Sequence, residues 1–255
     1  MILHLSDLHF GTEREACLQA IRQLCEEHPF EAVVVSGDLT QRARFIQFYA
    51  CRQFLDSLKL PYLVVPGNHD IPLYNVWNRF FSPFARYQLF FGGMENTLET
   101  EHFYVIGVNS IRRRYHTRGH ISLNQIQEID LKLQQAPAHK IKLIAAHQPF
   151  YTPPDHSHGV KDCPMLGRIA LEQWSQHGLN GLLTRVRHEK GGRNPLERSL
   201  ACMVPEARLE LARCCQRWIL SPLRLPIPPL GHVMRELVYH SFLLISPKME
   251  LRAFR

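Results

Sequence analysis

Residues 61–70 read "PYLVVPGNHD", an apolar run that ends in an amide, an imidazole and a carboxylate. The "YLVV" segment suits the middle of a buried sheet, whereas Asn68, His69 and Asp70 are poor strand formers. Polar residues at the end of a strand usually make a turn or hold a ligand. The stretch therefore predicts a buried strand whose carboxyl end carries chemically active side chains.

The same pattern of a short apolar run followed by polar residues recurs along the chain. Further strands are predicted at "MILHLSD" (1–7), "EAVVVSGD" (31–38), "HFYVIGVNS" (102–110), "IKLIAAHQPF" (141–150) and "GLNGLL" (178–183). Apolar residues at helical spacing alternate with them and predict helices over 14–28, 44–58, 122–136 and 168–178. Alternating strands and helices indicate an α/β protein with an at least partly parallel sheet, buried on both faces.

Composition describes an ordinary globular chain. Its 255 residues fit one sizeable domain or two small ones, with 45% hydrophobic and 21% charged residues. No run approaches the about 18 apolar residues of a membrane span, and the start "MILHLSDLHF" does not resemble a signal peptide. The seven Cys include no CxxC pair, so we expect a reducing cytoplasmic location and no membrane partner.

The net charge of +7 is concentrated in one segment. Residues 185–230 contain nine Lys or Arg and four Glu, which together contribute +5. The remainder is nearly neutral, which argues against nucleic acid as the main partner. Fifteen His residues raise the question of a metal instead.

Polar residues end four of the predicted strands. They are Asp7 and His9, then Asp38, then Asn68 with His69 and Asp70, and finally His147. Any one of them alone is most simply a capping or turn residue. Because ligands bind outside the carboxyl ends of strands in open α/β sheets, the coincidence of four such ends predicts a binding crevice there.

The donor types indicate which ions such a crevice would bind. Asp, His and Asn without thiolates suit divalent Mn, Fe, Zn or Ni. Five or six ligands exceed one tetrahedral site, so we expect two divalent cations, with Asp38 as the natural bridge. Two cations about 4 Å apart form a clamp for in-line attack on phosphorus.

The residues "DLH" (7–9), "GD" (37–38), "GNHD" (67–70) and the His of "AAHQPF" (145–150) together resemble the calcineurin-like metallophosphoesterase family. Within it, "LHLSDLHFG", "VVVSGDLTQRAR" and "PYLVVPGNHDIPLYN" are most similar to the bacterial branch that includes 3',5'-cyclic nucleotide phosphodiesterases. The resemblance covers roughly residues 1–184. It implies a four-layer α/β/β/α sandwich, here with an atypical C-terminal segment.

The resemblance also implies roles for individual residues. Asp7 and His9 would bind the first cation, Asp38 both, and Asn68 and His147 the second. His69 would protonate the leaving oxygen or stabilise its charge, and Asp70 would orient His69. The implied reaction is phosphodiester hydrolysis by a metal-bound hydroxide, with a small phosphoester such as a cyclic nucleotide as substrate. Asn68 and His69 would contact that substrate. Arg42 would hold its charge, or else belong to a solvated loop.

The sequence departs from the family at its last motif, a Gly-His-x-His on the loop after the strand that follows His147. Here Thr184 is followed by "RVRHEKGG", and in direct register only His188 matches. Joining "GLLT" directly to "GHVM" (231–234) instead makes His232 the first imidazole, with Met234 in place of the second. Neither register supplies both imidazoles, and the oligomeric state is not predicted.

We therefore predict a metallophosphoesterase domain over 1–184, an atypical basic, Pro-rich insert over 185–230, and a terminal strand pair of the same domain over 231–255. The insert is either a partner-binding or nucleic-acid-binding element or an unselected sequence acquired by insertion or frameshift, and we favour the latter. Three functions stay open: an active dinuclear phosphodiesterase, an impaired pseudoenzyme that binds a phosphate ligand or partner, and, with the least support, a nucleic-acid binder using the insert.

Overall fold

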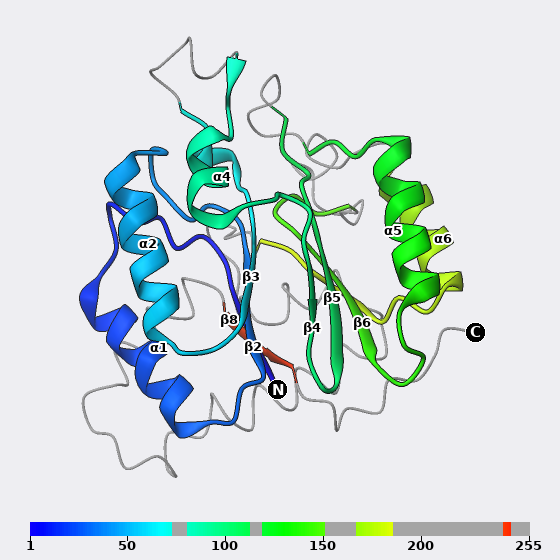
Figure 1. Cartoon of the computed structure of the whole chain (residues 1–255), viewed down its shortest axis with the longest axis horizontal. Helices are drawn as coiled ribbons and strands as arrows, with labels where there is room; N and C mark the ends of the chain where they lie inside the picture. Colours follow the sequence, from blue (N-terminus) through cyan, green and yellow to red (C-terminus); the bar gives the residue numbers. More distant parts are fainter. Residues whose placement is uncertain (73–80, 113–118, 151–166, 186–241, 246–255) are drawn as a thin grey trace, which may run out of the picture.

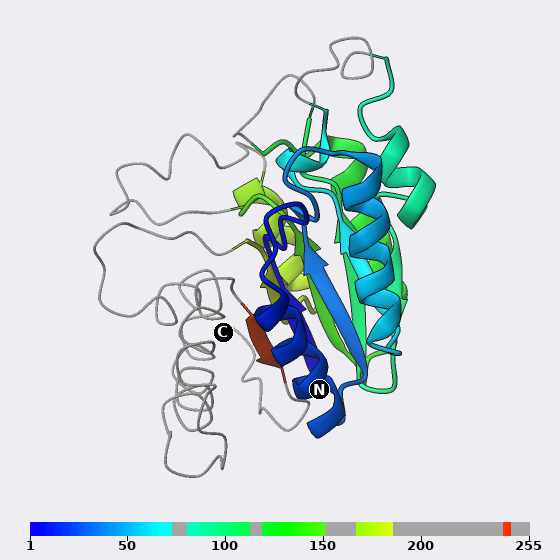
Figure 2. The same ribbon diagram turned by 90° about the vertical axis from the view of Figure 1, so that its left-hand side faces the viewer.

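The computed structural model describes residues 1–72, 81–112, 119–150, 167–185 and 242–245, and within them two sheets are stacked face to face (Figure 1). The first sheet has the order β3-β2-β1-β8. Its strands are β1 (Ile2–Leu5), β2 (Ala32–Ser36), β3 (Tyr62–Val65) and β8 (Phe242–Ile245). The first three run parallel, and β8 pairs antiparallel with β1 (Figure 2).

The second sheet has the order β4-β5-β6-β7. Its strands are β4 (Thr97–Glu99), β5 (Phe103–Val108), β6 (Ile141–Ala146) and β7 (Gly181–Leu183). The last three are parallel, and β4 is antiparallel to β5. The six strands predicted in 1–184 are confirmed. Strand β4 was not expected, because its three residues alternate between exposed and half-buried and leave no apolar run.

Helices cover the outer face of each sheet. Those on the first sheet are α1 (Glu15–Glu27), α2 (Phe45–Ser57) and α4 (Ala85–Phe91), and those on the second are α5 (Leu123–Gln135) and α6 (Gly167–Gln176). A short 3-10 helix, η1, spans Asn68–Asp70. Four of the helices match the predicted segments. The short helix α4 was not predicted, although its Tyr87 is buried and its hydroxyl donates to the Val64 carbonyl at 2.9 Å.

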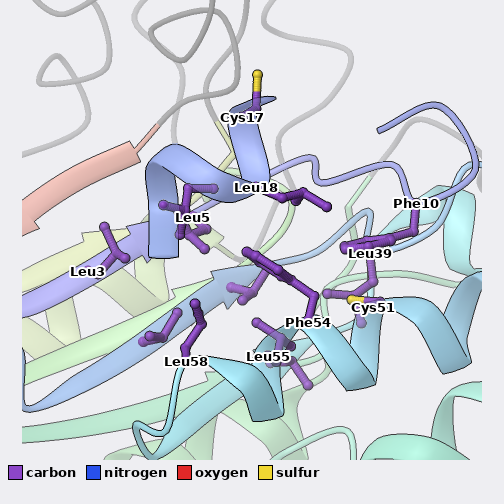
Figure 3. Packing of buried hydrophobic residues seen from close by; sticks show 14 of the residues in the cluster. Leu3, Leu5, Phe10, Cys17, Leu18, Leu39, Cys51, Phe54, Leu55 and Leu58 are labelled. Carbon is purple, nitrogen blue, oxygen red and sulfur yellow. The ribbon is translucent and has the colours of Figure 1, made fainter. Parts of the chain in front are cut away.

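Alternating strand residues separate the apolar interior into three layers. Leu3 and Leu5 point toward α1 and α2, where they pack with Phe54 (Figure 3). Ile2 and Val34 point the other way and pack against residues of the second sheet. Because α5 and α6 close a third layer around Trp174, the expected four-layer α/β/β/α sandwich is confirmed.

The C-terminal part of the chain enters the first sheet through one strand. Ile245 lies opposite Ile2, so β8 extends the edge that β1 would otherwise leave open. Residues 186–241 and 246–255, which include the rest of the predicted insert and the second strand of the predicted pair, lie outside the described residues. The boundaries at 184 and 230 stay predictions. In the described part, every helix is too short or too polar to cross a bilayer.

Candidate metal centre

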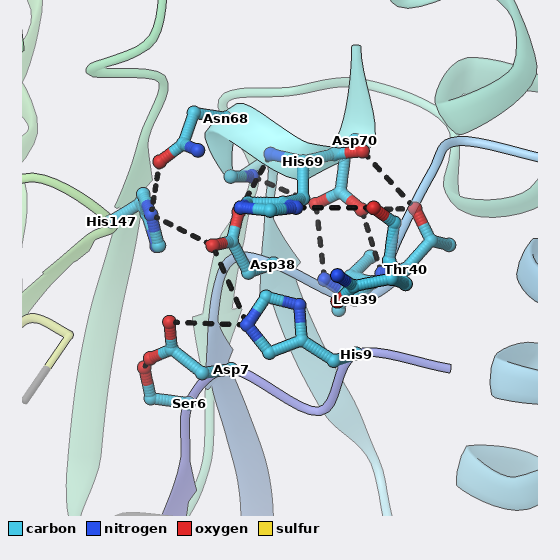
Figure 4. A network of polar contacts seen from close by, with 12 residues as sticks. Ser6, Asp7, His9, Asp38, Leu39, Thr40, Asn68, His69, Asp70 and His147 are labelled. Atoms are coloured by element: carbon cyan, nitrogen blue, oxygen red, sulfur yellow. Dashed lines mark hydrogen bonds and ion pairs between the residues drawn. The ribbon is translucent and has the colours of Figure 1, made fainter. Parts of the chain in front are cut away.

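The residues that end β1 and β2 form a cluster of two carboxylates and one imidazole (Figure 4). His9 Nε2 lies 3.9 Å from Asp7 Oδ1 and 3.9 Å from Asp38 Oδ2. One ligand atom from each of the three residues lies within 4.8 Å of the others. Carboxylate oxygens and an imidazole nitrogen at this spacing fit a divalent cation of the borderline class.

A second group of potential ligand atoms comes together where the two sheets meet. His147, after β6, places Nε2 3.1 Å from Asn68 Oδ1 and 3.5 Å from Asp38 Oδ2. Its Nδ1 donates to the Ser36 carbonyl at 2.9 Å, because a carbonyl can only accept. In the neutral ring, Nε2 therefore presents a lone pair to two oxygens. With the ring in that form, three acceptor atoms would converge without a hydrogen between them, an arrangement that fits a cation.

Asp38 belongs to both groups. Its Oδ2 is the oxygen near His9 and near His147, while its Oδ1 accepts from the His69 backbone N–H at 2.9 Å. The residue is 2% exposed, so this charge is held away from water. One carboxylate oxygen placed between two imidazoles has the geometry that a bridging ligand requires.

The backbone is strained at the three clustered residues. Asp7, His9 and Asp38 have φ of 57°, 47° and 51°, a region that costs non-glycine residues of order 1–3 kcal/mol each. The loops after β1 and β2 hold this conformation in place, since Asp7 N–H donates to the Gly37 carbonyl and His9 N–H to the Asp38 carbonyl. In this backbone conformation, the side chains of Asp7, His9 and Asp38 point toward one another.

Two glycines allow the loops to approach closely. A Cβ on Gly37 would lie 2.5 Å from His147 Nδ1, and Gly37 itself has φ of 88°. A Cβ on Gly67 would lie 2.0 Å from the Asp38 backbone N and 2.1 Å from Asp38 Oδ1. Any side chain at these positions would displace a proposed ligand.

Asp70 binds the loop backbone, and the expectation that it orients His69 stays a prediction. Its carboxylate accepts from the backbone N–H groups of Leu39, Thr40 and Gly67 and from the Thr40 hydroxyl, and none of these four donors is the His69 ring. Burial, with the Asp38 charge acting in the same direction, raises the pKa of Asp70 above its ordinary value. Asp70 therefore clamps the loops after β2 and β3 together.

The His69 ring contacts Gln41 and His9. Its Nδ1 donates to the Gln41 carbonyl at 3.1 Å, and its ring lies edge-on to the His9 ring with centroids 4.8 Å apart. Burial lowers the pKa of His9 from its ordinary value, although the charges of Asp38 and Asp7 raise it. Burial thus favours the neutral His9 imidazole, the form that can bind a cation.

Of the remaining predicted residues, only Arg42 is described by the structure, and it is not part of the cluster. Arg42 is exposed on the loop before α2, and its backbone N–H donates to Gln47 Oε1. His188 and His232 lie outside the described residues. Sequence reasoning missed Ser36, Thr40 and Arg185. Ser36 acts through its backbone carbonyl and Thr40 through hydrogen bonds to Asp70. Residue type alone reveals neither contact.

The family model Metallophos, described as calcineurin-like phosphoesterase, matches residues 1–175. The chain belongs to the calcineurin-like phosphoesterase family.

Three curated relatives are similar to parts of this chain. The chain is 34% identical over 82 residues to the glycerophosphodiester phosphodiesterase GpdQ of Enterobacter lignolyticus (strain SCF1), covering 28% of this chain and 29% of the relative. It is 29% identical over 122 residues to a probable cyclic nucleotide phosphodiesterase of Ruthia magnifica subsp. Calyptogena magnifica, covering 47% and 46%. A probable cyclic nucleotide phosphodiesterase of Vesicomyosocius okutanii subsp. Calyptogena okutanii (strain HA) is 25% identical over 155 residues, covering 58% and 61%. The matches thus span less than two thirds of each relative.

A solved structure supports the fold. The purple acid phosphatase PPD1 from yellow lupin (Lupinus luteus) seeds aligns with a TM-score of 0.52 and 14% identity, over 72% of this chain and 37% of that chain. At this identity the likeness concerns the arrangement of sheets and helices alone.

Proposed function

We propose that this protein is a metal-dependent phosphodiesterase with a two-cation site. The observation that carries the proposal is the position of Asp38 Oδ2, 3.9 Å from His9 Nε2 and 3.5 Å from His147 Nε2. Family membership supports the hydrolysis of phosphoesters. Bound divalent cations supply Lewis-acid polarisation of the phosphoryl group and lower the pKa of water toward neutrality.

The residues divide into two ligand groups that share one carboxylate. Asp7, His9 and Asp38 would hold one cation, and Asp38, Asn68 and His147 the other. The Ser36 carbonyl holds the His147 proton on Nδ1, which leaves the Nε2 lone pair for binding. Asn68 adds a ligand oxygen without a negative charge, so it does not repel an approaching phosphate. Manganese, iron, zinc and nickel all suit this donor set.

His69 is the proposed proton donor to the leaving oxygen. Because Nδ1 donates to Gln41, the ring would act on substrate through Nε2. An imidazole has an ordinary pKa near neutrality, so it can hold and release a proton under cellular conditions. Asp70 would position this residue through the loop backbone that its carboxylate binds.

Hydrolysis of bis-p-nitrophenyl phosphate by the full chain tests the proposal, with Mn, Fe, Zn or Ni added singly to metal-stripped protein. We expect turnover that requires a divalent ion and that is lost in Asp38→Ala. The matched control is Glu128→Gln, which alters an exposed carboxylate on α5 paired with Lys132. Absence of turnover with every ion would reject the proposal.

A cyclic nucleotide is the proposed substrate class, from the names of two relatives. A glycerophosphodiester is the competing class, from the name of the third. Comparing kcat/KM for 3',5'-cyclic AMP, glycerophosphoethanolamine and p-nitrophenyl phosphate separates a cyclic diester, an open diester and a monoester. A clear preference for either of the other two substrates would contradict the cyclic-nucleotide assignment.

An impaired pseudoenzyme is the second candidate, and one observation favours it. In the direct register, Arg185, a cation, takes the position where the family resemblance calls for the Gly of Gly-His-x-His. Binding of phosphate without any turnover would support this alternative. The nucleic-acid hypothesis depends on residues 185–230, nearly all outside the described residues. Salt-dependent RNA or DNA binding that persists after their deletion would remove that segment from consideration.

A further inference from the structure

Arg185 follows β7 and lies beside one of the proposed ligands. Its backbone N–H donates to the His147 carbonyl at 3.2 Å, just beyond the point where the β6–β7 pairing ends at Ala145 and Leu183. His147 in turn lies 3.5 Å from Asp38. The arginine therefore starts from the rim of the cluster, on the second sheet.

The side chain carries a buried donor without an acceptor. Nε of Arg185 is shielded from solvent and has no hydrogen-bond partner among the described residues. Buried donors are normally paired, and an unpaired one on a charged group is costly. The unpaired Nε–H of Arg185 lies beside the proposed ligands. A bound molecule that carries acceptor oxygens would pair it.

The charge of Arg185 acts on the same carboxylates that form the cluster. Burial lowers the pKa of the Arg185 guanidinium from its usual range, whereas the charges of Asp7 and Asp38 raise it. An arginine remains protonated in proteins at neutral pH, so the site contains a fixed positive charge.

We propose that Arg185 is an oxyanion-binding residue of this site and holds a phosphoryl group through its guanidinium. The inference rests on the proposed function, since it takes a phosphoester as the ligand. The planar guanidinium suits phosphate oxygens geometrically as well as by charge. The same fixed charge repels a cation held by Asp7, His9 and Asp38, so these residues bind a divalent ion more weakly than they would without it.

Titration calorimetry of the full chain with inorganic phosphate tests the proposal, with Mn²⁺ present and with the metal chelated. We expect Arg185→Met to weaken phosphate binding about tenfold or more under both conditions, and Arg185→Lys to retain most of it. A separate Mn²⁺ titration should show tighter binding in Arg185→Met, by about fivefold or more. The control is Arg22→Met, which alters an arginine on α1 paired with Glu15.

Unchanged phosphate affinity in folded Arg185→Met overturns the proposal, even if Mn²⁺ binds more tightly, because charge balance alone would produce that second result. Absence of phosphate binding by the unmodified chain overturns it as well. If the Met variant does not fold, Arg185→Gln replaces it, because glutamine keeps a polar side chain without the charge. Absence of bis-p-nitrophenyl phosphate turnover rejects the proposed function separately, because neither titration depends on turnover.

Discussion

The two sheets contribute very differently to the proposed metal centre. The first sheet supplies Asp7, Asp38 and Asn68 from the ends of three parallel strands, whereas the described part of the second supplies His147 and the neighbouring Arg185. Loops of the first sheet are strained and mutually hydrogen-bonded. The first sheet thus builds most of the proposed ligand set, and the second completes or modifies it.

The two sheets differ in how many contacts hold the side chains of the site in place. Asp70 accepts four hydrogen bonds, three of which join the loop after β2 to the loop after β3. His147 reaches the first sheet through one hydrogen bond to Ser36 and its approach to Asn68 and Asp38. A change on the first sheet should therefore disturb several ligands, and a change on the second should disturb one.

Removing ligands one by one gives the largest expected effects. Asp38→Ala should weaken binding at both cation positions by more than about a hundredfold, because losses even outside the direct ligands cost about 10–100-fold. Asp7→Ala and His147→Ala should each weaken one position. Mn²⁺ titration calorimetry and metal analysis after dialysis measure this. Full retention of both ions by Asp38→Ala would refute the shared carboxylate.

Gly67→Ala tests the packing of the loops on the first sheet. The new Cβ would meet the Asp38 backbone N at 2.0 Å, so we expect a loss of about 1–3 kcal/mol in the free energy of unfolding and weaker Mn²⁺ binding. Urea denaturation provides the measurement. In the control Gly93→Ala, the Cβ would meet the end of the Asn96 side chain at 2.7 Å, which can move away. Equal losses of unfolding free energy in both variants would contradict the inference that Gly67 is packed tightly against Asp38.

His4 predicts a pH dependence of stability. This β1 residue is buried and hydrogen-bonded to Ser36 Oγ at 2.8 Å, and burial lowers its pKa from 6.5 to about 4. Because the unfolded chain takes up the proton first, the contribution of neutral His4 is complete above pH 6.5. It falls by about 3 kcal/mol as the pH drops from 6.5 to 4. His4→Gln should flatten this part of the profile in urea denaturation, whereas exposed His139→Gln should not.

The smallest expected effect lies in the helical layer of the second sheet. Ser122 caps α5, since its Oγ accepts from the Gln125 N–H. Ser122→Ala should cost about 1 kcal/mol of unfolding free energy and leave Mn²⁺ affinity unchanged. Ser175→Ala, on exposed Ser175 of α6, serves as the control. A change in metal affinity would show that the second sheet is coupled to the ligands more strongly than we infer.

The parts predicted from the sequence are those that a repeating pattern encodes. Apolar runs such as "EAVVVSGD" predicted the parallel strands, and Asp7, Asp38, Asn68 and His147 were expected together because each follows a strand. The structure brings these four side chains to one edge. Their roles as ligands stay proposals.

Other features depend on contacts that no pattern reveals. The hydrogen bonds from the Leu39 and Thr40 backbone to Asp70 were not predicted, because the sequence does not show which peptide N–H groups lie nearest to a buried carboxylate. The left-handed conformations of Asp7, His9 and Asp38 have no sequence signature, since glycine is the usual residue there. Strand β4 is too short for its alternation to be recognised.

The hydrogen bond between His147 and Ser36 joins two layers that could otherwise separate. Since Asp38 and His147 come from opposite sheets, the second ligand group exists only while those sheets are docked. A bound ion would then oppose their separation, by about 2.7 kcal/mol at a free concentration one hundred times its dissociation constant. Metal binding would thus stabilise the docked arrangement of the two sheets. The melting temperature would then rise with the fraction of protein molecules that hold a bound ion.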